Sequence, residues 1–200
     1  MLDIDRFIVE LDRLTTAVYF YDEIYGEQET IKIISGLSSE ATRIIQRSLH
    51  NDIVMSLARL LYDGENYKTS EATYEYLSQY HLAKKYASYI DHGLQNHRDE
   101  IAEIKASLNV KDYRDLVLAH NDKATLTGEN DHPKHNLETE VLLRILRLSR
   151  TLFFGVRLKL AKERGEQSLP ITDGNVHRNG VGTNFLKNIE NITRQARVTR

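Results

Sequence analysis

The sequence predicts an all-α fold, an antiparallel bundle of long helices with shorter accessory ones. Apolar residues recur at steps of three and four over several long stretches, as they do along one face of a helix. No stretch alternates apolar and polar residues in the manner of a half-buried strand, and no strand–turn–strand pattern occurs. The 200 residues include only two prolines, and both stand where a helical pattern stops, so no proline interrupts a predicted helix.

The first half of the chain is predicted to contain four helices separated by turn residues. Their approximate ranges are 4–25, 28–35, 39–62 and 70–80. Gly26 ends the first of them. Ser38 or Ser39 can cap the third, because a serine hydroxyl accepts hydrogen bonds from the free N–H groups of a first helical turn. The third helix stops at the turn-forming run Asp63-Gly64-Glu65-Asn66.

The second half is predicted to contain two long helices and two short ones. Their ranges, in order, are 81–108, 114–120, 137–165 and 185–192. The polar residues 121–136 are expected to form a loop, and a basic tail follows the last short helix. We therefore expect residues 1–165 to form the helical bundle, and residues 166–200 to add a loop, an accessory helix and the tail.

The composition is that of a globular protein, with 40% apolar and 28% charged residues. Because the chain has no cysteine, it has no disulfide, no thiolate nucleophile and no cysteine-based zinc site. This is compatible with the reducing cytoplasm, where we expect the protein to act. No apolar run approaches the ~18 residues that a membrane span needs, and the acidic N-terminus lacks a signal-peptide pattern, so we expect no membrane partner.

Charge is distributed unevenly along the chain. Residues 1–135 hold 15 Lys and Arg against 23 Asp and Glu, whereas residues 136–200 hold 12 against 6. Such asymmetry indicates a polyanion or an acidic partner, although the basic face could equally pack against the acidic half of the same chain. The basic side chains of the last long helix are Arg144, Arg147, Arg150, Arg157, Lys159, Lys162 and Arg164. They could follow an RNA backbone, and we expect RNA contacts from Arg144, Arg147 and Arg150.

The most informative segment is Arg114-Asp115-Leu116-Val117-Leu118-Ala119-His120. It places an arginine, which is always charged, six positions before a histidine, which can gain or lose a proton near pH 7. Phosphodiester cleavage can use both groups, because the cation stabilises charge on phosphate oxygens and the imidazole moves protons. On an unbroken helix, six steps of ~100° leave the two side chains ~240° apart. The helix must therefore end or distort before His120, or pairs from two subunits must converge.

This segment, an arginine followed by a polar residue, a short spacer and a histidine, resembles the motif of the HEPN superfamily. Together with the stretch Ser56-Leu57-Ala58-Arg59-Leu60-Leu61-Tyr62-Asp63, it resembles in particular the branch related to the abortive-infection protein AbiU2. The resemblance extends over the predicted bundle, and it implies a HEPN-like arrangement of the helices.

The resemblance further implies a metal-independent endoribonuclease without a cofactor, acting as a toxin or antiviral effector in a prokaryote. His120 would be the acid/base, and Arg114 would stabilise charge on the pentacovalent phosphorane. Asp115 would assist the site by accepting a hydrogen bond from the arginine or by orienting the histidine. The alternative is a purely structural role, as an acidic residue of the first helical turn that the helix dipole favours. Two subunits of a homodimer would share the cleft, with RNA as the substrate and an antitoxin protein as a further candidate partner.

Two other functions stay open at the level of the sequence. A HEPN-fold protein without catalysis would bind RNA or a protein, whereas a metal-binding hydrolase would use ligands from the predicted loop region. These ligands would be His120, Asp122, His132 and His135. Pro133, between two of these histidines, disfavours the metal site. The other histidines, His50 among them, lie in no such cluster, and Arg59 and Asp63 are spaced for an i,i+4 ion pair.

Overall fold

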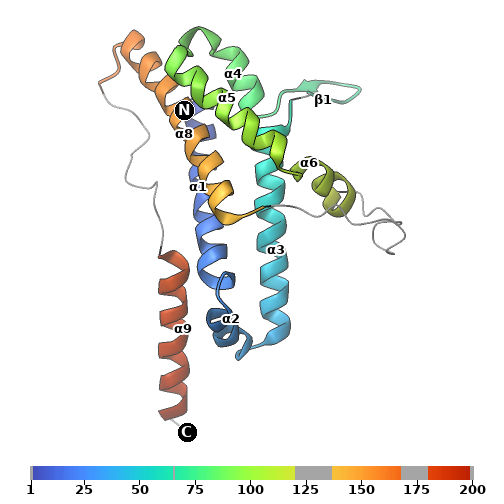
Figure 1. Ribbon diagram of the computed structural model, residues 1–200, viewed down its shortest axis with the longest axis vertical. Helices are drawn as coiled ribbons and strands as arrows, with labels where there is room; N and C mark the ends of the chain where they lie inside the picture. Colours follow the sequence, from blue (N-terminus) through green and yellow to red (C-terminus); the bar gives the residue numbers. More distant parts are fainter. Residues whose placement is uncertain (1, 65, 120–136, 168–179, 199–200) are drawn as a thin grey trace.

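The computed structural model describes residues 2–64, 66–119, 137–167 and 180–198, and these ranges are almost wholly helical (Figure 1). The bundle is built around α1 (Asp3–Tyr25), which contacts both α3 (Ser39–Leu57) and α8 (Thr139–Arg164). α1 runs in the opposite direction to both of these neighbours, and α5 (His92–Ser107) packs against α8. The predicted all-α antiparallel bundle is therefore confirmed.

Shorter elements connect the long helices. α3 continues directly into a π-helical turn, after which the chain forms a two-stranded antiparallel hairpin. The shorter elements are α2 (Gln28–Ser35), η1 (Ala58–Tyr62), β1 (Tyr67–Lys68), β2 (Thr73–Tyr74), α4 (Gln79–Lys85), η2 (Ala87–Tyr89), α6 (Val110–Tyr113), η3 (Arg114–Ala119) and α9 (Val181–Val198). Of these, η1 and η3 are π-helical and η2 is a 3₁₀ turn.

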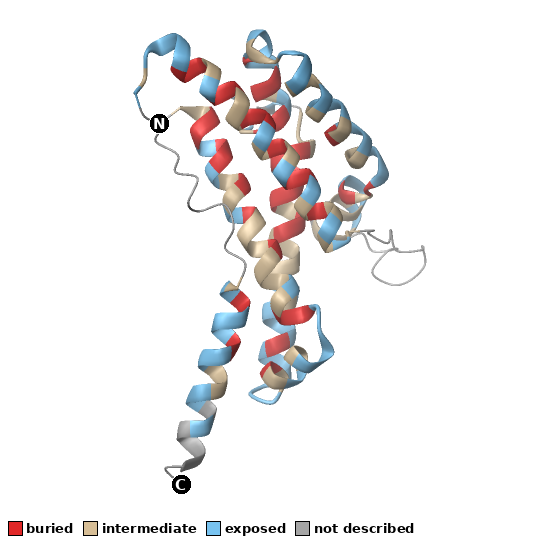
Figure 2. Ribbon diagram, turned by 60° about the vertical axis from the view of Figure 1, so that its left-hand side comes forward, coloured by how far each residue is buried: buried red, intermediate tan, exposed pale blue. Residues whose placement is uncertain are grey.

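The core lies where the inner faces of the long helices meet, and these buried stripes are visible in Figure 2. On α1 the buried side chains follow the three- and four-residue steps expected from the sequence. Phe7 of α1 meets Phe153 of α8 edge to face, with 4.9 Å between the ring centroids. Truncating a fully buried phenylalanine to alanine typically lowers stability by about 3–5 kcal/mol. The α1–α8 contact is therefore a main source of stability.

A buried ion pair also joins these two helices. Nε of Arg157 lies 2.6 Å from Oδ1 of Asp5, and each side chain is only 2% exposed. Nη2 of the same arginine lies 2.5 Å from Oε2 of Glu166. Arg157 is therefore not part of an exposed basic row, and the expectation that it follows an RNA backbone is wrong. The sequence did not reveal its burial because the partner that makes burial tolerable is 152 positions away.

The helix predicted over residues 70–80 is wrong for most of its length. The chain forms β2 there and enters α4 only at Gln79. Thr73 and Tyr74 are β-branched and aromatic, which suits an extended pairing better than a helix. The register of the hairpin pairs Tyr74 with Tyr67 and Thr73 with Lys68.

The single helix predicted over residues 81–108 is broken near residue 90. Asp91 begins α5 by accepting a hydrogen bond from the backbone N–H of Leu94 at 3.0 Å, as an N-cap residue does. Just before the break, the hydroxyl of Tyr86 donates to Oδ1 of Asp3 at 2.6 Å. The end of α4 therefore lies against the start of α1.

Other helix ends match the sequence. Oγ of Ser38 accepts a hydrogen bond from the backbone N–H of Ala41 at 3.2 Å and caps α3. Gly165 ends α8 with a φ of 66°, a left-handed conformation that glycine adopts without steric cost.

α9 is the accessory C-terminal helix that the sequence predicts, but it is longer than residues 185–192. The carboxylate of Glu23 on α1 accepts hydrogen bonds from the backbone N–H groups of Gly180, Gly182 and Thr183. This places a negative charge at the positive end of the helix dipole. A Cβ atom on Gly182 would lie 2.8 Å from Cβ of Glu23, so a glycine allows the close approach. α9 then packs against α1 and α2 through Leu186 and Ile189, and its C-terminal part extends past the end of the bundle (Figure 2).

None of the helices in the described ranges is long and apolar enough to cross a membrane.

Candidate functional site

Arg114 is the first residue of η3 and is held by two carboxylates. Its Nη1 lies 2.5 Å from Oδ1 of Asp63, and its Nε lies 2.6 Å from Oδ1 of Asp115. The arginine side chain is 16% exposed. The hydrogen bond to Asp115 and, to a smaller extent, the hydrogen bond to Asp63 raise the pKa of Arg114, although partial burial acts in the opposite direction. The guanidinium is therefore fixed in position and remains charged at any physiological pH.

Asp63 stands at the end of the π-helical turn η1. Its backbone N–H donates to the carbonyl of Ala58 at 3.0 Å, a step of five residues. This wider turn changes the faces on which side chains lie, so Asp63 contacts Arg114, while Arg59 donates to Oγ of Ser56 at 3.3 Å. The expected i,i+4 ion pair between Arg59 and Asp63 is therefore wrong.

Two π-helical turns meet at this site. η1 contacts α6, the short helix that leads into η3, and η3 contacts α3. π-helical turns are rare and often mark functional sites, because they cost regular hydrogen bonding. The helix that carries the Arg114 segment is thus distorted. A distortion is one of the two alternatives by which Arg114 and His120, six positions apart, could act on one phosphate.

The end of α5 supports η1 from the other side. The hydroxyl of Tyr62 donates to the carbonyl of Lys105 at 3.2 Å, and the ammonium of Lys105 donates to the carbonyl of Leu61 and lies 4.9 Å from the centroid of the Tyr62 ring. Burial raises the pKa of Tyr62 to about 12 and lowers the pKa of Lys105. The phenol therefore keeps its proton at neutral pH, so these two residues support the turn that positions Asp63.

His50 of α3 lies close to the site, which sequence reasoning missed. Its ring centroid is 5.9 Å from that of Tyr113, the residue directly before Arg114, and 6.1 Å from that of Tyr21 on α1. Burial raises the pKa of Tyr113. No local pattern could have revealed either His50 or Asp63 as a neighbour of Arg114, since only the packing of α3 against η3 and of η1 against α6 brings them together.

His120 lies outside the described residues. The same holds for the proposed metal ligands Asp122, His132 and His135. Of the predicted catalytic residues, the structure therefore places Arg114 and Asp115, and it brings these two into direct contact.

The predicted RNA-binding arginines lie along a cleft of about 430 Å³ between α1 and α8. Nε of Arg144 lies 2.9 Å from Oε1 of Glu100, and Nε of Arg150 lies 2.8 Å from Oδ1 of Asp12. Arg147 is exposed between them. Two of the three arginines thus have carboxylate partners within the chain.

The AbiU2 family matches residues 1–145, which is more than half of the chain and includes both the Ser56–Asp63 stretch and the Arg114–His120 segment. Comparison with curated proteins and with solved structures found no match. The family match and the all-α bundle agree with the motif at Arg114. The chain therefore belongs to the AbiU2 family of HEPN proteins, a family related to abortive infection.

Proposed function

We propose that the protein is a metal-independent endoribonuclease that acts as a toxin or antiviral effector in the prokaryotic cytoplasm. The observation that supports this most is the fixed guanidinium of Arg114, held by Asp63 and Asp115 at the start of a π-helical turn. A cation fixed before substrate arrives stabilises developing negative charge without reorganisation at the moment of reaction. The family match covers this arginine and the histidine six positions later.

In the proposed reaction, His120 takes the proton from a ribose 2′-hydroxyl, and the 2′-oxygen attacks the adjacent phosphorus. Arg114 stabilises the charge on the phosphorane oxygens. The bond to the 5′-oxygen then breaks and that oxygen takes a proton from the imidazolium of His120, which leaves a 2′,3′-cyclic phosphate and a 5′-hydroxyl end. Nε and Nη1 of Arg114 face carboxylates and no described residue accepts from Nη2, so Nη2 is the nitrogen that would contact phosphate.

Two subunits complete the site in this proposal. A homodimer formed through the face that carries Arg114 would bring two arginine–histidine pairs into one cleft. Arg144, Arg147 and Arg150 would contact the RNA backbone outside the reacting bond, and an antitoxin protein would restrain the enzyme. Light scattering at micromolar concentration should give twice the monomer mass; a monomer would remove the shared-cleft arrangement.

Cleavage of RNA in excess EDTA tests the central proposal. Wild type should cut RNA and leave 2′,3′-cyclic phosphate ends, and the Arg114→Ala and His120→Ala variants should each lose about 10²–10⁴-fold in rate. His132→Ala and His135→Ala are the matched controls and should cleave like wild type. Loss of activity in EDTA and its return with Zn²⁺ would instead favour a metal-binding hydrolase.

A non-catalytic RNA- or protein-binding role is the second candidate. The observation that favours it is that two carboxylates already balance the charge of Arg114, so a phosphate must compete with Asp63 and Asp115. An unchanged RNA substrate together with normal RNA binding would support this role.

A further inference from the structure

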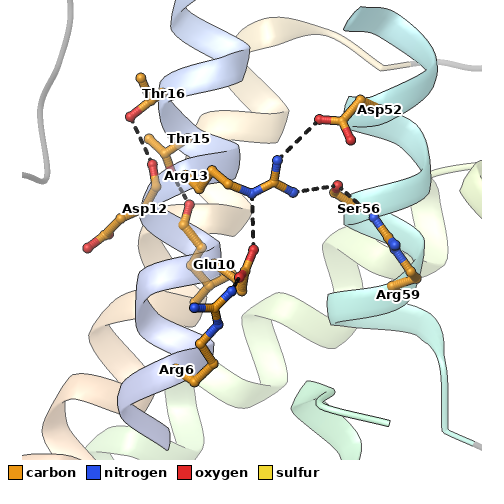
Figure 3. Close-up of polar contacts among 10 residues, drawn as sticks. Arg6, Glu10, Asp12, Arg13, Thr15, Thr16, Asp52, Ser56 and Arg59 are labelled. Carbon is orange, nitrogen blue, oxygen red and sulfur yellow. Dashed lines mark hydrogen bonds and ion pairs between the residues drawn. The ribbon is translucent and has the colours of Figure 1, made fainter. Parts of the chain in front are cut away.

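A second group of arginines lies in the groove between α1 and α3, away from the reaction proposed for Arg114. Figure 3 shows Arg13 reaching from α1 toward Ser56 and Asp52 of α3, while Arg59 of η1 reaches the same serine from the other side. Oγ of Ser56 accepts from Nη2 of Arg13 at 3.2 Å and from Nη2 of Arg59 at 3.3 Å. The serine is 2% exposed, so two guanidinium groups converge on one buried neutral oxygen.

The carboxylates in this groove serve only one of the two arginines. Nε of Arg13 lies 3.0 Å from Oε2 of Glu10, and its Nη1 lies 3.5 Å from Oδ2 of Asp52. Arg59 forms no ion pair with any residue in the described part of the chain, and its only acceptor there is the hydroxyl of Ser56. A hydroxyl oxygen is a weaker acceptor for a guanidinium than a charged oxygen. The groove therefore has donors that an anionic oxygen would satisfy better.

A cleft of about 330 Å³ opens beside these arginines. Its lining comprises Arg13, Ser56 and Arg59 together with Glu10, Leu60, Tyr76 and Leu77. The carboxylate of Glu10 is already paired with Arg6 and Arg13. Tyr76 is 38% exposed, so part of its ring is available to a ligand. A lining that combines guanidinium groups with an aromatic ring and two leucines suits a molecule with an anionic group and a flat apolar surface. A nucleotide has both, since its phosphate pairs with arginine and its base stacks on aromatic side chains.

The π-helical turn η1 connects this cleft to the candidate reaction site. Arg59 is the second residue of η1, and Asp63, which holds Arg114, directly follows the same turn. An RNA strand that occupies both places would thus be held at the two ends of one short turn.

We propose that the α1–α3 cleft binds one nucleotide of single-stranded RNA, with its phosphate on Arg13 and Arg59 and its base against Tyr76. The choice of RNA as the ligand rests on the proposed function, whereas the anion-binding character of the cleft follows from its own residues. Arg59 is a binding residue in this proposal and takes no part in bond breaking.

Fluorescence anisotropy with a fully 2′-O-methylated oligoribonucleotide tests the proposal, because this probe lacks the attacking hydroxyl and cannot be cleaved. Arg59→Gln should raise the dissociation constant about tenfold and lower the slope of log K against log salt by about one. Arg59→Lys should recover part of the affinity because it keeps the charge. Tyr76→Ala should weaken binding by about tenfold with an unchanged salt slope, since stacking is not ionic.

Arg98→Gln is the matched control, because Arg98 is an exposed arginine of α5 that lines none of these clefts. It should change affinity less than twofold, as expected for an arginine outside the binding surface. Circular dichroism should confirm that all variants keep their helices. Wild-type affinity in either Arg59→Gln or Tyr76→Ala would overturn the proposal, as would the absence of RNA binding by wild type. Equal affinity for adenosine monophosphate and for the oligonucleotide would also overturn it, because the cleft would then be a site for free nucleotides.

The outcome is separable from that of the proposed function. His120→Ala should abolish cleavage of ordinary RNA while it binds the methylated probe like wild type. If RNA is not cut but Arg59→Gln still weakens probe binding, the nuclease proposal fails and the cleft proposal stands. If RNA is cut but Arg59→Gln binds the probe like wild type, the cleft proposal fails and the nuclease proposal stands.

Discussion

The guanidinium of Arg114 lies 2.5 Å from the carboxylate of Asp63, a residue 51 positions earlier in the chain. Each residue adjoins a π-helical turn, since Asp63 follows η1 and Arg114 begins η3. The contact joins the two stretches that carry the resemblance to AbiU2, and it determines where the positive charge of the candidate site is held.

Replacing Asp63 should therefore impair the proposed reaction without unfolding the protein. Asp63→Asn keeps the size of the side chain but removes its charge, so Arg114 loses one of its two ion pairs. A small displacement of a catalytic group can lower the rate by about 10²-fold, and we expect a loss of about 10–100-fold in RNA cleavage. The matched control is Asp112→Asn, an exposed acid of the neighbouring α6. A rate equal to that of wild type for Asp63→Asn would show that this contact is not needed to position Arg114.

His50 offers a direct comparison with His120, because its ring lies against Tyr113 beside Arg114. If His120 is the acid/base, His50→Gln should reduce the cleavage rate by less than about fivefold, whereas removal of a general acid or base lowers rates by about 10²–10⁴-fold. Single-turnover cleavage of the same RNA by His50→Gln and by His120→Gln measures the two losses in rate. A larger loss with His50→Gln than with His120→Gln would move the acid/base role to α3.

The buried pair of Asp5 and Arg157 should be needed for stability as a pair. Arg157→Ala leaves a buried carboxylate without its partner, which typically lowers stability by about 3–5 kcal/mol. The double replacement Asp5→Leu with Arg157→Met removes both charges and should restore most of that loss, since replacing a buried ion pair by apolar residues is often neutral or stabilising. Nη1 of Arg157 has no acceptor among the described residues, which favours this result. Urea unfolding of the three proteins provides the comparison, and a double variant no more stable than the single one would contradict it.

Asp3 should contribute to stability at neutral pH and lose that contribution in acid. Burial alone would raise the pKa of Asp3, but hydrogen bonds from Lys85 and Tyr86 outweigh it and bring the pKa below the ordinary value of 3.8. The unfolded chain therefore takes up this proton at a higher pH than the folded protein does. The stabilisation is complete well above pH 3.8, declines as the pH falls through that value and is gone below the folded pKa.

Urea unfolding of wild type and Asp3→Asn at a series of pH values from 7 to 3 measures this contribution. The two proteins should differ most at pH 7 and converge toward pH 3. Asp99→Asn, an exposed acid of α5, controls for the general loss of negative charge. A difference between wild type and Asp3→Asn that stays constant over the whole range would contradict the assignment.

The sequence alone determined the features that depend on neighbours a few residues apart. The apolar stripe of α1, the cap at Ser38 and the end of α8 at Gly165 are local patterns, and the structure confirms each of them. The Arg114 segment and the Ser56–Asp63 stretch are also local, and they were sufficient to indicate the family.

The tertiary structure decided which distant residues meet. Whether Asp63 pairs with Arg59 or with Arg114 depends on the π-helical register of η1, which no apolar periodicity encodes. Arg157 has the same charge as its exposed neighbours along α8, and only Asp5 on another helix makes its burial tolerable. The physical reason is common to both cases: hydrogen-bonded helices are specified over a few residues, whereas the partner of a charged side chain is set by packing between elements far apart in the chain.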